Sequence, residues 1–100
     1  MSPISSQELF MRMQNGEELN LLDVREEIEF HTYNIGGRNV LLSQFINNLD
    51  KLKYNKTDEI IVICKVGLRS ETARELLVQN GYLQARNLTG GLMALQKLKY

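Results

Sequence analysis

The sequence has very little of what marks a secreted or membrane-spanning protein. It contains one cysteine, Cys64, so an internal disulfide is impossible and an oxidising compartment is not indicated. No apolar run approaches the length of about 18 residues that a membrane-spanning helix requires. The first residues, MSPISSQELFMRM, lack the basic start and apolar stretch of a signal peptide. We therefore expect a soluble cytoplasmic protein with no membrane contact.

An excess of charge of either sign is also absent. The chain has 12 basic and 12 acidic residues and a net charge of zero. Bulk nucleic-acid binding depends on neutralising many phosphates, so this balance argues against a nucleic-acid partner but leaves room for a local basic pocket. Apolar residues make up 43% and charged residues 24% of the 100 residues, as is usual for a globular chain. The length predicts one domain, residues 1–100.

Helical and strand patterns alternate along the chain. The first helix is predicted to begin after Ser5, because Ser5 and Glu8, three residues later, have the spacing of a capping box. Gly16 is predicted to end this helix. Short strands and helices then follow one another without a repeat or a linker. Strands are predicted at 19–24, 37–42, 59–64 and 85–91, and further helices at 25–34 (with Ile28 facing inward), 43–52, 70–81 and 91–100. This alternation predicts an α/β fold of three layers, with a central, mostly parallel sheet and helices on both faces.

The single cysteine lies at the end of the clearest strand. The stretch EIIVIC is short, continuous and β-branched, as expected for a strand covered on both faces. Ligands of parallel sheets collect at the carboxyl ends of the strands, where Cys64 lies. The next helix is predicted to begin near Ser70, which would cap it. Backbone N–H groups of residues 65–70 are expected to converge on the Cys64 sulfur and favour its thiolate.

The loop after Cys64 combines residue types that suit an anion. Gly67 permits backbone angles that a side chain would forbid, and Lys65 and Arg69 add positive charge. Arg69 is predicted to grip an anionic substrate with two hydrogen bonds. A buried, inert thiol is the alternative, because most cysteines simply fill space. We predict Cys64 as the catalytic residue, with an anion-binding loop formed by Lys65, Val66, Gly67, Leu68, Arg69 and Ser70.

Three stretches of the sequence resemble conserved blocks of one enzyme family. CKVGLRSETA resembles the active-site loop of the rhodanese-like sulfurtransferases, in which Cys-x-x-Gly-x-Arg-Ser leads into a helix. LLDVREEIEF is similar to the family's first block, and NLTGGLMAL resembles its closing block. The sequence departs from the family at Asn34-Ile35-Gly36-Gly37, where His-Ile-Pro-Gly is usual, and at Leu95, where a tryptophan is common.

The resemblance implies a rhodanese-type thiosulfate sulfurtransferase. The Cys64 thiolate would take the outer sulfur of a donor such as thiosulfate and hold it as a persulfide. Cyanide, a small thiol or a protein thiol would then accept the sulfur, and a sulfur-relay protein is one expected partner. The mechanism requires no metal and no organic cofactor. Asp23 and Arg25 match the family's first block, where such residues mostly brace the fold.

Two other readings of the sequence remain open. Rhodanese-like domains also occur as non-catalytic binding modules, although those often lose the cysteine that this chain retains. Phosphatases and arsenate reductases of related fold place one more residue between the cysteine and the arginine than the four that separate Cys64 from Arg69. The shorter loop favours sulfur chemistry. The physiological donor and acceptor, the pathway and the oligomeric state are not determined by these patterns.

Overall fold

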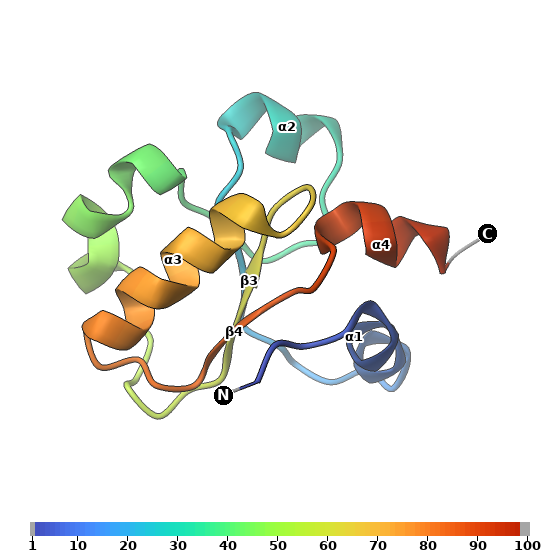
Figure 1. The fold of residues 1–100 in the computed structure, drawn as a ribbon, viewed down its shortest axis with the longest axis horizontal. Helices are drawn as coiled ribbons and strands as arrows, with labels where there is room; N and C mark the ends of the chain where they lie inside the picture. Colours follow the sequence, from blue (N-terminus) through green and yellow to red (C-terminus); the bar gives the residue numbers. More distant parts are fainter. Residues whose placement is uncertain (1, 99–100) are drawn as a thin grey trace.

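A computed structural model describes residues 2–98 and contains a four-stranded parallel sheet between two layers of helices (Figure 1). The strands lie in the order β2-β1-β3-β4, and every neighbouring pair is parallel. The strands are β1 (Leu21–Asp23), β2 (Arg38–Asn39), β3 (Ile60–Ile63) and β4 (Ala85–Asn87). The helices are α1 (Ser6–Gln14), α2 (Glu27–Thr32), α3 (Leu68–Gln79) and α4 (Gly91–Lys97), with short 3₁₀ helices η1 (Leu42–Gln44) and η2 (Ile46–Lys51). The predicted fold class is confirmed, and the end of the helix predicted at 91–100 lies outside the described residues.

Strand β3 shows why its sequence is continuously apolar. Ile60 and Val62 pack into one core, and Ile61 and Ile63 pack into another on the opposite face of the sheet. All four side chains are fully buried. Successive side chains of a strand point to opposite faces, so a strand covered on both faces has no position for a polar residue. The continuous run therefore predicted a central strand correctly.

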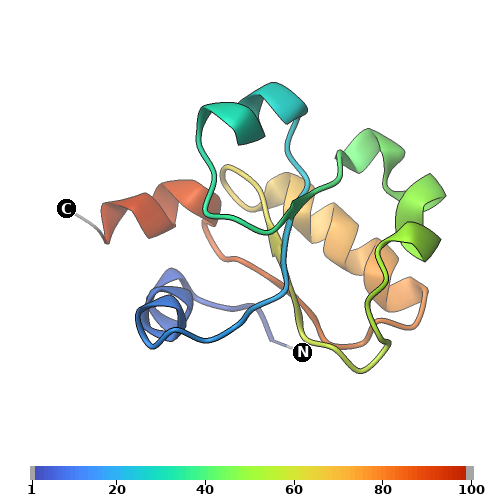
Figure 2. The same cartoon turned by 180° about the vertical axis from the view of Figure 1, so that it is seen from behind.

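The two cores belong to different groups of helices. One contains residues of α3 and of the segment that forms η1 and η2, including Phe45 between the two 3₁₀ helices, Leu49, Leu52 directly after η2, Ala73 and Leu77. The other contains residues of α1 and α4, including Leu9, Leu92 and Leu95, together with Ile4 and Leu88. Figures 1 and 2 show these layers from opposite sides, with α1 and α4 together on one side of the sheet. Helix α2 lies apart from both layers, near the loop that follows β3.

Three local predictions were wrong. The helix predicted at 43–52 forms two 3₁₀ helices instead, since this stretch contains asparagines, and the Asn48 side chain hydrogen-bonds the backbone carbonyl of Gln44. Ile28 is 76% exposed, because α2 lies at the edge of the molecule instead of on the sheet. Ser70 does not cap α3, which begins two residues earlier after Gly67. Ser70 is buried in the first turn and faces Cys64.

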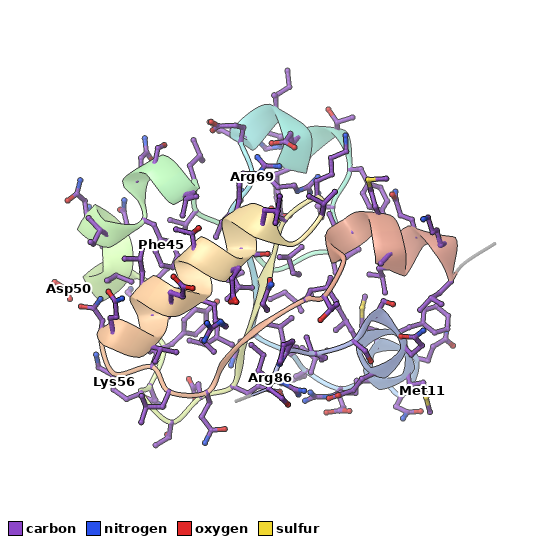
Figure 3. All side chains as sticks on the ribbon, in the orientation of Figure 1. Met11, Phe45, Asp50, Lys56, Arg69 and Arg86 are labelled. Atoms are coloured by element: carbon purple, nitrogen blue, oxygen red, sulfur yellow. The ribbon has the colours of Figure 1, made fainter. Side chains whose placement is uncertain are left out.

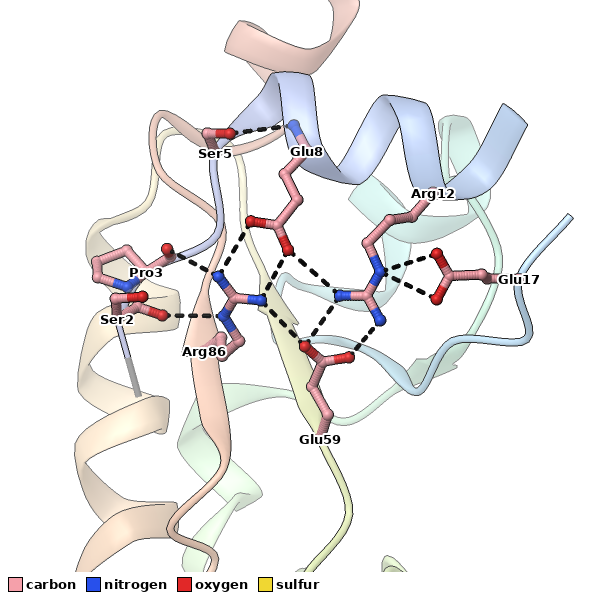
Figure 4. A network of polar contacts seen from close by, with 8 residues as sticks. All are labelled: Ser2, Pro3, Ser5, Glu8, Arg12, Glu17, Glu59 and Arg86. Atoms are coloured by element: carbon pink, nitrogen blue, oxygen red, sulfur yellow. Dashed lines mark hydrogen bonds and ion pairs between the residues drawn. The ribbon is translucent and has the colours of Figure 1, made fainter. Parts of the chain in front are cut away.

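A network of ion pairs joins distant segments at the amino end of β3 (Figure 4). Arg86 contacts Glu8 at 2.9 Å and Glu59 at 3.0 Å, and Arg12 contacts Glu59 at 2.6 Å. Arg86 also donates to the backbone carbonyls of Ser2 and Pro3. Glu59 directly precedes β3 and Cys64 directly follows it, so this network lies at the end of the strand opposite to the cysteine.

None of the helices formed between residues 2 and 98 is both long enough and apolar enough to cross a membrane. Within the same residues, no group of three or more histidine, cysteine, aspartate or glutamate side chains is arranged to hold a metal ion.

Candidate active site

The Cys64 sulfur accepts hydrogen bonds from the loop that follows it. The backbone N–H groups of Gly67 and Ser70 lie 3.0 Å and 3.3 Å from Sγ. Gly67 has a φ of +100°, in the left-handed region that glycine adopts without strain. This turn brings the chain back so that the first residues of α3 face the sulfur. Within the predicted loop of residues 65–70, the N–H groups of Gly67 and Ser70 therefore converge on the sulfur.

The surroundings of Cys64 act on its pKa in opposite directions. Burial raises the pKa, because a thiolate loses hydration inside a protein. Hydrogen bonds from the Ser70 hydroxyl and from the N–H groups of Ser70, Gly67 and Val66 lower it. The hydrogen bonds outweigh burial, so the pKa of Cys64 lies below its ordinary value. A thiolate is the nucleophilic form of cysteine, and this environment favours it.

Asn87, the last residue of β4, hydrogen-bonds the cysteine loop at Gly67 and Ser70. Its side-chain N–H donates to the Gly67 carbonyl at 3.1 Å, which directs its carbonyl oxygen toward Ser70. The Ser70 hydroxyl lies 2.5 Å from that oxygen and 3.2 Å from the Cys64 sulfur. A hydroxyl has one hydrogen to donate, so Asn87 and a Cys64 thiolate compete for it.

Helix α4 supports the same loop through its first turn. The backbone N–H of Leu92 donates to the Cys64 carbonyl at 2.9 Å, and that of Met93 donates to the Lys65 carbonyl at 3.0 Å. Gly91 makes this approach possible, because a Cβ atom there would lie 2.4 Å from the Lys65 carbonyl oxygen. The Gly-Gly turn of the closing block therefore serves close contact between α4 and the cysteine loop.

Cys64 itself has no exposed surface. The side chains of Val66 and Leu68, in contrast, are 45% and 76% exposed. The thiol thus lies directly beneath a short surface loop. A donor can reach the sulfur only when this loop or its neighbours move, so access and thiolate stability are separate requirements of the site.

Arg69 does not project as a free cation. Its guanidinium makes two hydrogen bonds to the Glu29 carboxylate, at 2.6 Å and 3.0 Å. Figure 3 shows Arg69 between the start of α3 and α2, the helix that carries Glu29. The pair lowers the pKa of Glu29 to about 2, so this carboxylate stays ionised at neutral pH. Arg69 was predicted to donate two hydrogen bonds to an anionic substrate. In the structure it donates both to Glu29, a carboxylate of the same chain.

Asp23 and Arg25 form a buried ion pair. Arg25 donates to both carboxylate oxygens of Asp23, with Nη2 and Oδ2 2.8 Å apart. The Arg25 side chain also donates to the Tyr33 carbonyl at 2.6 Å, and Asn39 donates to the carbonyls of Asp23 and Arg25. These contacts tie the end of β1 to Tyr33, which follows α2, and to Asn39, the last residue of β2. The arrangement fits the bracing role that the sequence suggested.

A groove opens beside the cysteine loop, between α2 and α4. Its volume is about 330 Å³. It reaches the loop at Lys65, and its other lining residues are Arg25, Ile28, Glu29, Thr32, Tyr33, Leu92, Met93 and Gln96. The groove brings Arg25 and Lys65 together with an apolar surface. A donor or acceptor larger than a few atoms has room here beside Lys65, the residue that follows Cys64.

The sequence reasoning missed Glu29 and Asn87. Asn87 ends a strand next to β3, and the carboxyl ends of parallel strands meet at one edge of a sheet, so its position gave a usable signal. Glu29 gave no such signal, because only the folded position of α2 brings it to Arg69. His31, the one histidine, contacts Glu27 at 3.7 Å on the exposed side of α2 and is not part of the site.

Known proteins resemble this chain over most of its length. The family model described as "Rhodanese-like domain" matches residues 6–98. The "Probable adenylyltransferase/sulfurtransferase MoeZ" of Mycobacterium tuberculosis is 32% identical over 99 residues, which cover 96% of this chain but 25% of MoeZ. A "Sulfurtransferase" of Allochromatium vinosum is 29% identical, over 91% of this chain and 84% of that protein.

A solved structure gives the same result. The human single-domain sulfurtransferase TSTD1 superposes with a TM-score of 0.84 at 26% identity, over 95% of each chain. This chain thus spans only a quarter of MoeZ but nearly all of the small TSTD1 chain. Since the family model covers almost the entire sequence and the cysteine loop has the geometry described above, the chain belongs to the rhodanese-like domain family.

Proposed function

We propose that this protein is a rhodanese-type sulfurtransferase that takes sulfane sulfur from a donor such as thiosulfate and carries it as a persulfide on Cys64. The observation that supports this most is the set of hydrogen bonds to the Cys64 sulfur from Gly67 and Ser70. These donors suit a sulfur anion, whether it is the thiolate or the terminal sulfur of a persulfide. In this proposal Lys65, Val66, Gly67, Leu68, Arg69 and Ser70 form the substrate loop, and Asp23 and Arg25 support it.

The reaction has two steps. The Cys64 thiolate attacks the outer sulfur of thiosulfate, the sulfur–sulfur bond breaks, and its electron pair leaves with sulfite. The Cys64 persulfide then gives its terminal sulfur to cyanide or to a thiol, which restores the thiolate. The covalent intermediate divides the transfer into two displacements, each at a divalent sulfur atom. The side chains that cover Cys64 must move aside for each displacement.

The proposal extends to partners and location. MoeZ is named as a sulfurtransferase joined to an adenylyltransferase, which supports a protein of a sulfur relay as donor or acceptor for this chain as well. A small sulfur donor and a thiol or cyanide acceptor complete the set, without nucleic acid or membrane. We also propose a cytoplasmic location, where the lone cysteine remains reduced, and a single domain over residues 1–100.

Intact-mass spectrometry tests the intermediate. Incubation with thiosulfate should add one sulfur, about 32 mass units, as the two-step covalent scheme requires. Cyanide should remove this mass and release thiocyanate. Cys64→Ser should show neither the adduct nor turnover, because a hydroxyl cannot form a persulfide. Since Cys64 is the only thiol, the adduct has no other cysteine on which to form.

The same experiment separates the two remaining alternatives. If several sulfur donors leave the mass of the wild-type protein unchanged, the sulfurtransferase proposal fails and a non-catalytic binding module becomes the better reading. The buried thiol would then be structural. Phosphatase activity is disfavoured on two grounds. The loop between Cys64 and Arg69 is short. Arg69 is also ion-paired with Glu29, so it does not offer a free cation to a phosphate group.

A further inference from the structure

Glu29 and Arg69 form a bidentate ion pair at the end of the cysteine loop. Their two hydrogen bonds measure 2.6 Å and 3.0 Å, and the Glu29 carboxylate also accepts the backbone N–H of Glu26 at 3.1 Å. The Arg69 side chain is 36% exposed and the Glu29 side chain is 30% exposed. The carboxylate is therefore held in place from both sides. The charge of Arg69 is compensated before any donor arrives.

This compensation leaves little positive charge near Cys64. Arg25 is likewise paired, with the buried carboxylate of Asp23. Lys65 is the cation of the loop and groove that lies outside these two pairs. Three cations against two carboxylates leave a net charge of +1. A dianion such as thiosulfate gains less from this environment than it would from an unpaired Arg69.

The groove next to the loop favours a different kind of donor. Its lining includes the apolar side chains of Ile28, Leu92 and Met93. Ile28 is 76% exposed and Met93 is 42% exposed, although both are large hydrophobic residues. The volume of about 330 Å³ falls in the range of sites for small organic ligands and far exceeds what an inorganic anion fills.

We infer that Glu29 sets the donor preference of this site, so that among sulfur donors a monoanionic organic donor, with its apolar body between α2 and α4, reacts more efficiently than the dianion thiosulfate. This inference rests on the proposed sulfurtransferase function and specifies its substrate. Glu29 acts through Arg69 and does not touch the reacting sulfur atoms. It is a specificity-determining residue, not a catalytic one.

Benzenethiosulfonate is a suitable probe of this class. The Cys64 thiolate attacks its outer sulfur, the bond between the two sulfur atoms breaks, and the electron pair leaves with benzenesulfinate. One negative charge remains on the persulfide and one on the sulfinate, which balances the charges of thiolate and donor. Cyanide then takes the outer sulfur as thiocyanate. No external oxidant or reductant enters the reaction.

Glu29→Gln tests the inference, with Glu27→Gln as its matched control. Both variants remove one negative charge from α2, but Glu27 is 74% exposed and contacts His31 instead of the loop. Glutamine at position 29 keeps an oxygen for the Glu26 N–H, so the start of α2 is preserved. The measurement is kcat/KM for thiosulfate and for benzenethiosulfonate, with cyanide as acceptor, at low and high salt.

Glu29→Gln should raise kcat/KM for thiosulfate about tenfold at low salt, because a dianion gains most from an uncovered cation. The gain for the monoanion should be about threefold. High salt should reduce both gains, and Glu27→Gln should change either value by less than about twofold. Alkylation rates measured against pH give a second readout: uncovered Arg69 should lower the pKa of Cys64, which a merely structural change would not do.

The wild-type protein provides a test that needs no variant. Its kcat/KM, divided by the rate of each donor with free cysteine, should favour benzenethiosulfonate over thiosulfate. A preference for thiosulfate, an equal response of both donors to Glu29→Gln, or an equal effect of Glu27→Gln would overturn the inference alone. Absence of turnover and of any persulfide adduct with both donors would overturn the proposed function and the inference with it.

Discussion

The chemistry of the cysteine depends on one hydroxyl. Among the contacts that lower the pKa of Cys64, the hydrogen bond from the Ser70 side chain is the largest. The same hydroxyl lies 2.5 Å from the Asn87 side-chain oxygen, which competes for its single hydrogen. Formation of the thiolate draws this hydrogen toward sulfur. The Ser70 side chain, in the first turn of α3, is therefore expected to favour the thiolate together with the backbone N–H groups of the loop.

Ser70→Ala should raise the pKa of Cys64, because it removes this hydrogen bond while burial of the thiol remains. The pH dependence of alkylation by iodoacetamide measures the change as a shift of the midpoint to higher pH. Ser43→Ala, at an exposed position, is the control and should leave the midpoint unchanged. If both variants behave as wild type, the backbone N–H groups alone stabilise the thiolate.

Residues of the site differ in how well the sequence predicted them. Cys64, Gly67 and the loop around them were predicted from a local pattern, because a strand, a turn and a helix start follow one another directly. The prediction that Ser70 caps the helix was wrong, because Gly67 is the N-cap of α3. Ser70 lies in the first turn instead, with its hydroxyl facing Cys64. The partner of Arg69 was not predicted, because Glu29 is 40 residues away in the chain.

At the level of the elements, α4 and the cysteine loop are built against each other. Two N–H groups of the first turn of α4 donate to carbonyls of the loop. Gly91 has a φ of +62° and no room for a Cβ atom, which would lie 2.4 Å from the Lys65 carbonyl oxygen. The position thus requires glycine for two reasons, its backbone angle and its close approach.

Gly91→Ala should lower the free energy of unfolding more than Gly16→Ala does. The comparison separates the effect of the backbone angle, which both positions share, from that of the close approach, which only Gly91 of this pair has. Gly16 has a similar φ of +75° with nothing within 4 Å of an added Cβ, so it loses only the backbone term of about 1 kcal/mol. Gly91→Ala should cost about 2 kcal/mol more, because carbonyl groups of the loop must shift. Urea unfolding of both variants measures the difference. Equal losses would mean that the loop yields freely to α4.

On the scale of the whole molecule, an ion-pair network joins α1 to β4 and to the residue that precedes β3. Glu8 hydrogen-bonds Arg86, which lowers the pKa of Glu8. Arg12 and then Arg86 lower the pKa of Glu59 in the same way. Both folded values lie below the ordinary 4.5. The stability that these carboxylates contribute is therefore complete above about pH 4.5 and is lost as the pH falls through their lowered pKa values.

Arg86→Gln should be less stable than wild type by about 2 kcal/mol at pH 7, because hydrogen bonds to two charged groups are lost. It should also lose less stability than wild type between pH 7 and pH 3, since Glu8 then has a more ordinary pKa. Urea unfolding at both pH values is the measurement. Arg74→Gln is the control, because Arg74 pairs only locally with Glu71 and should have a small effect. A wild-type pH response in Arg86→Gln would contradict the role of the network.

The sequence by itself determined the alternation of strands and helices along the chain, the buried central strand and the cysteine loop. These features follow from patterns within a few residues, such as the apolar run of β3 and the glycine after Cys64. The tertiary structure decided which distant groups meet. It placed Glu29 on Arg69, Asn87 on Ser70 and Arg86 between Glu8 and Glu59. Such contacts depend on how α2, β4 and α1 pack around the sheet, and no local periodicity encodes a charge pair between segments that only packing brings together.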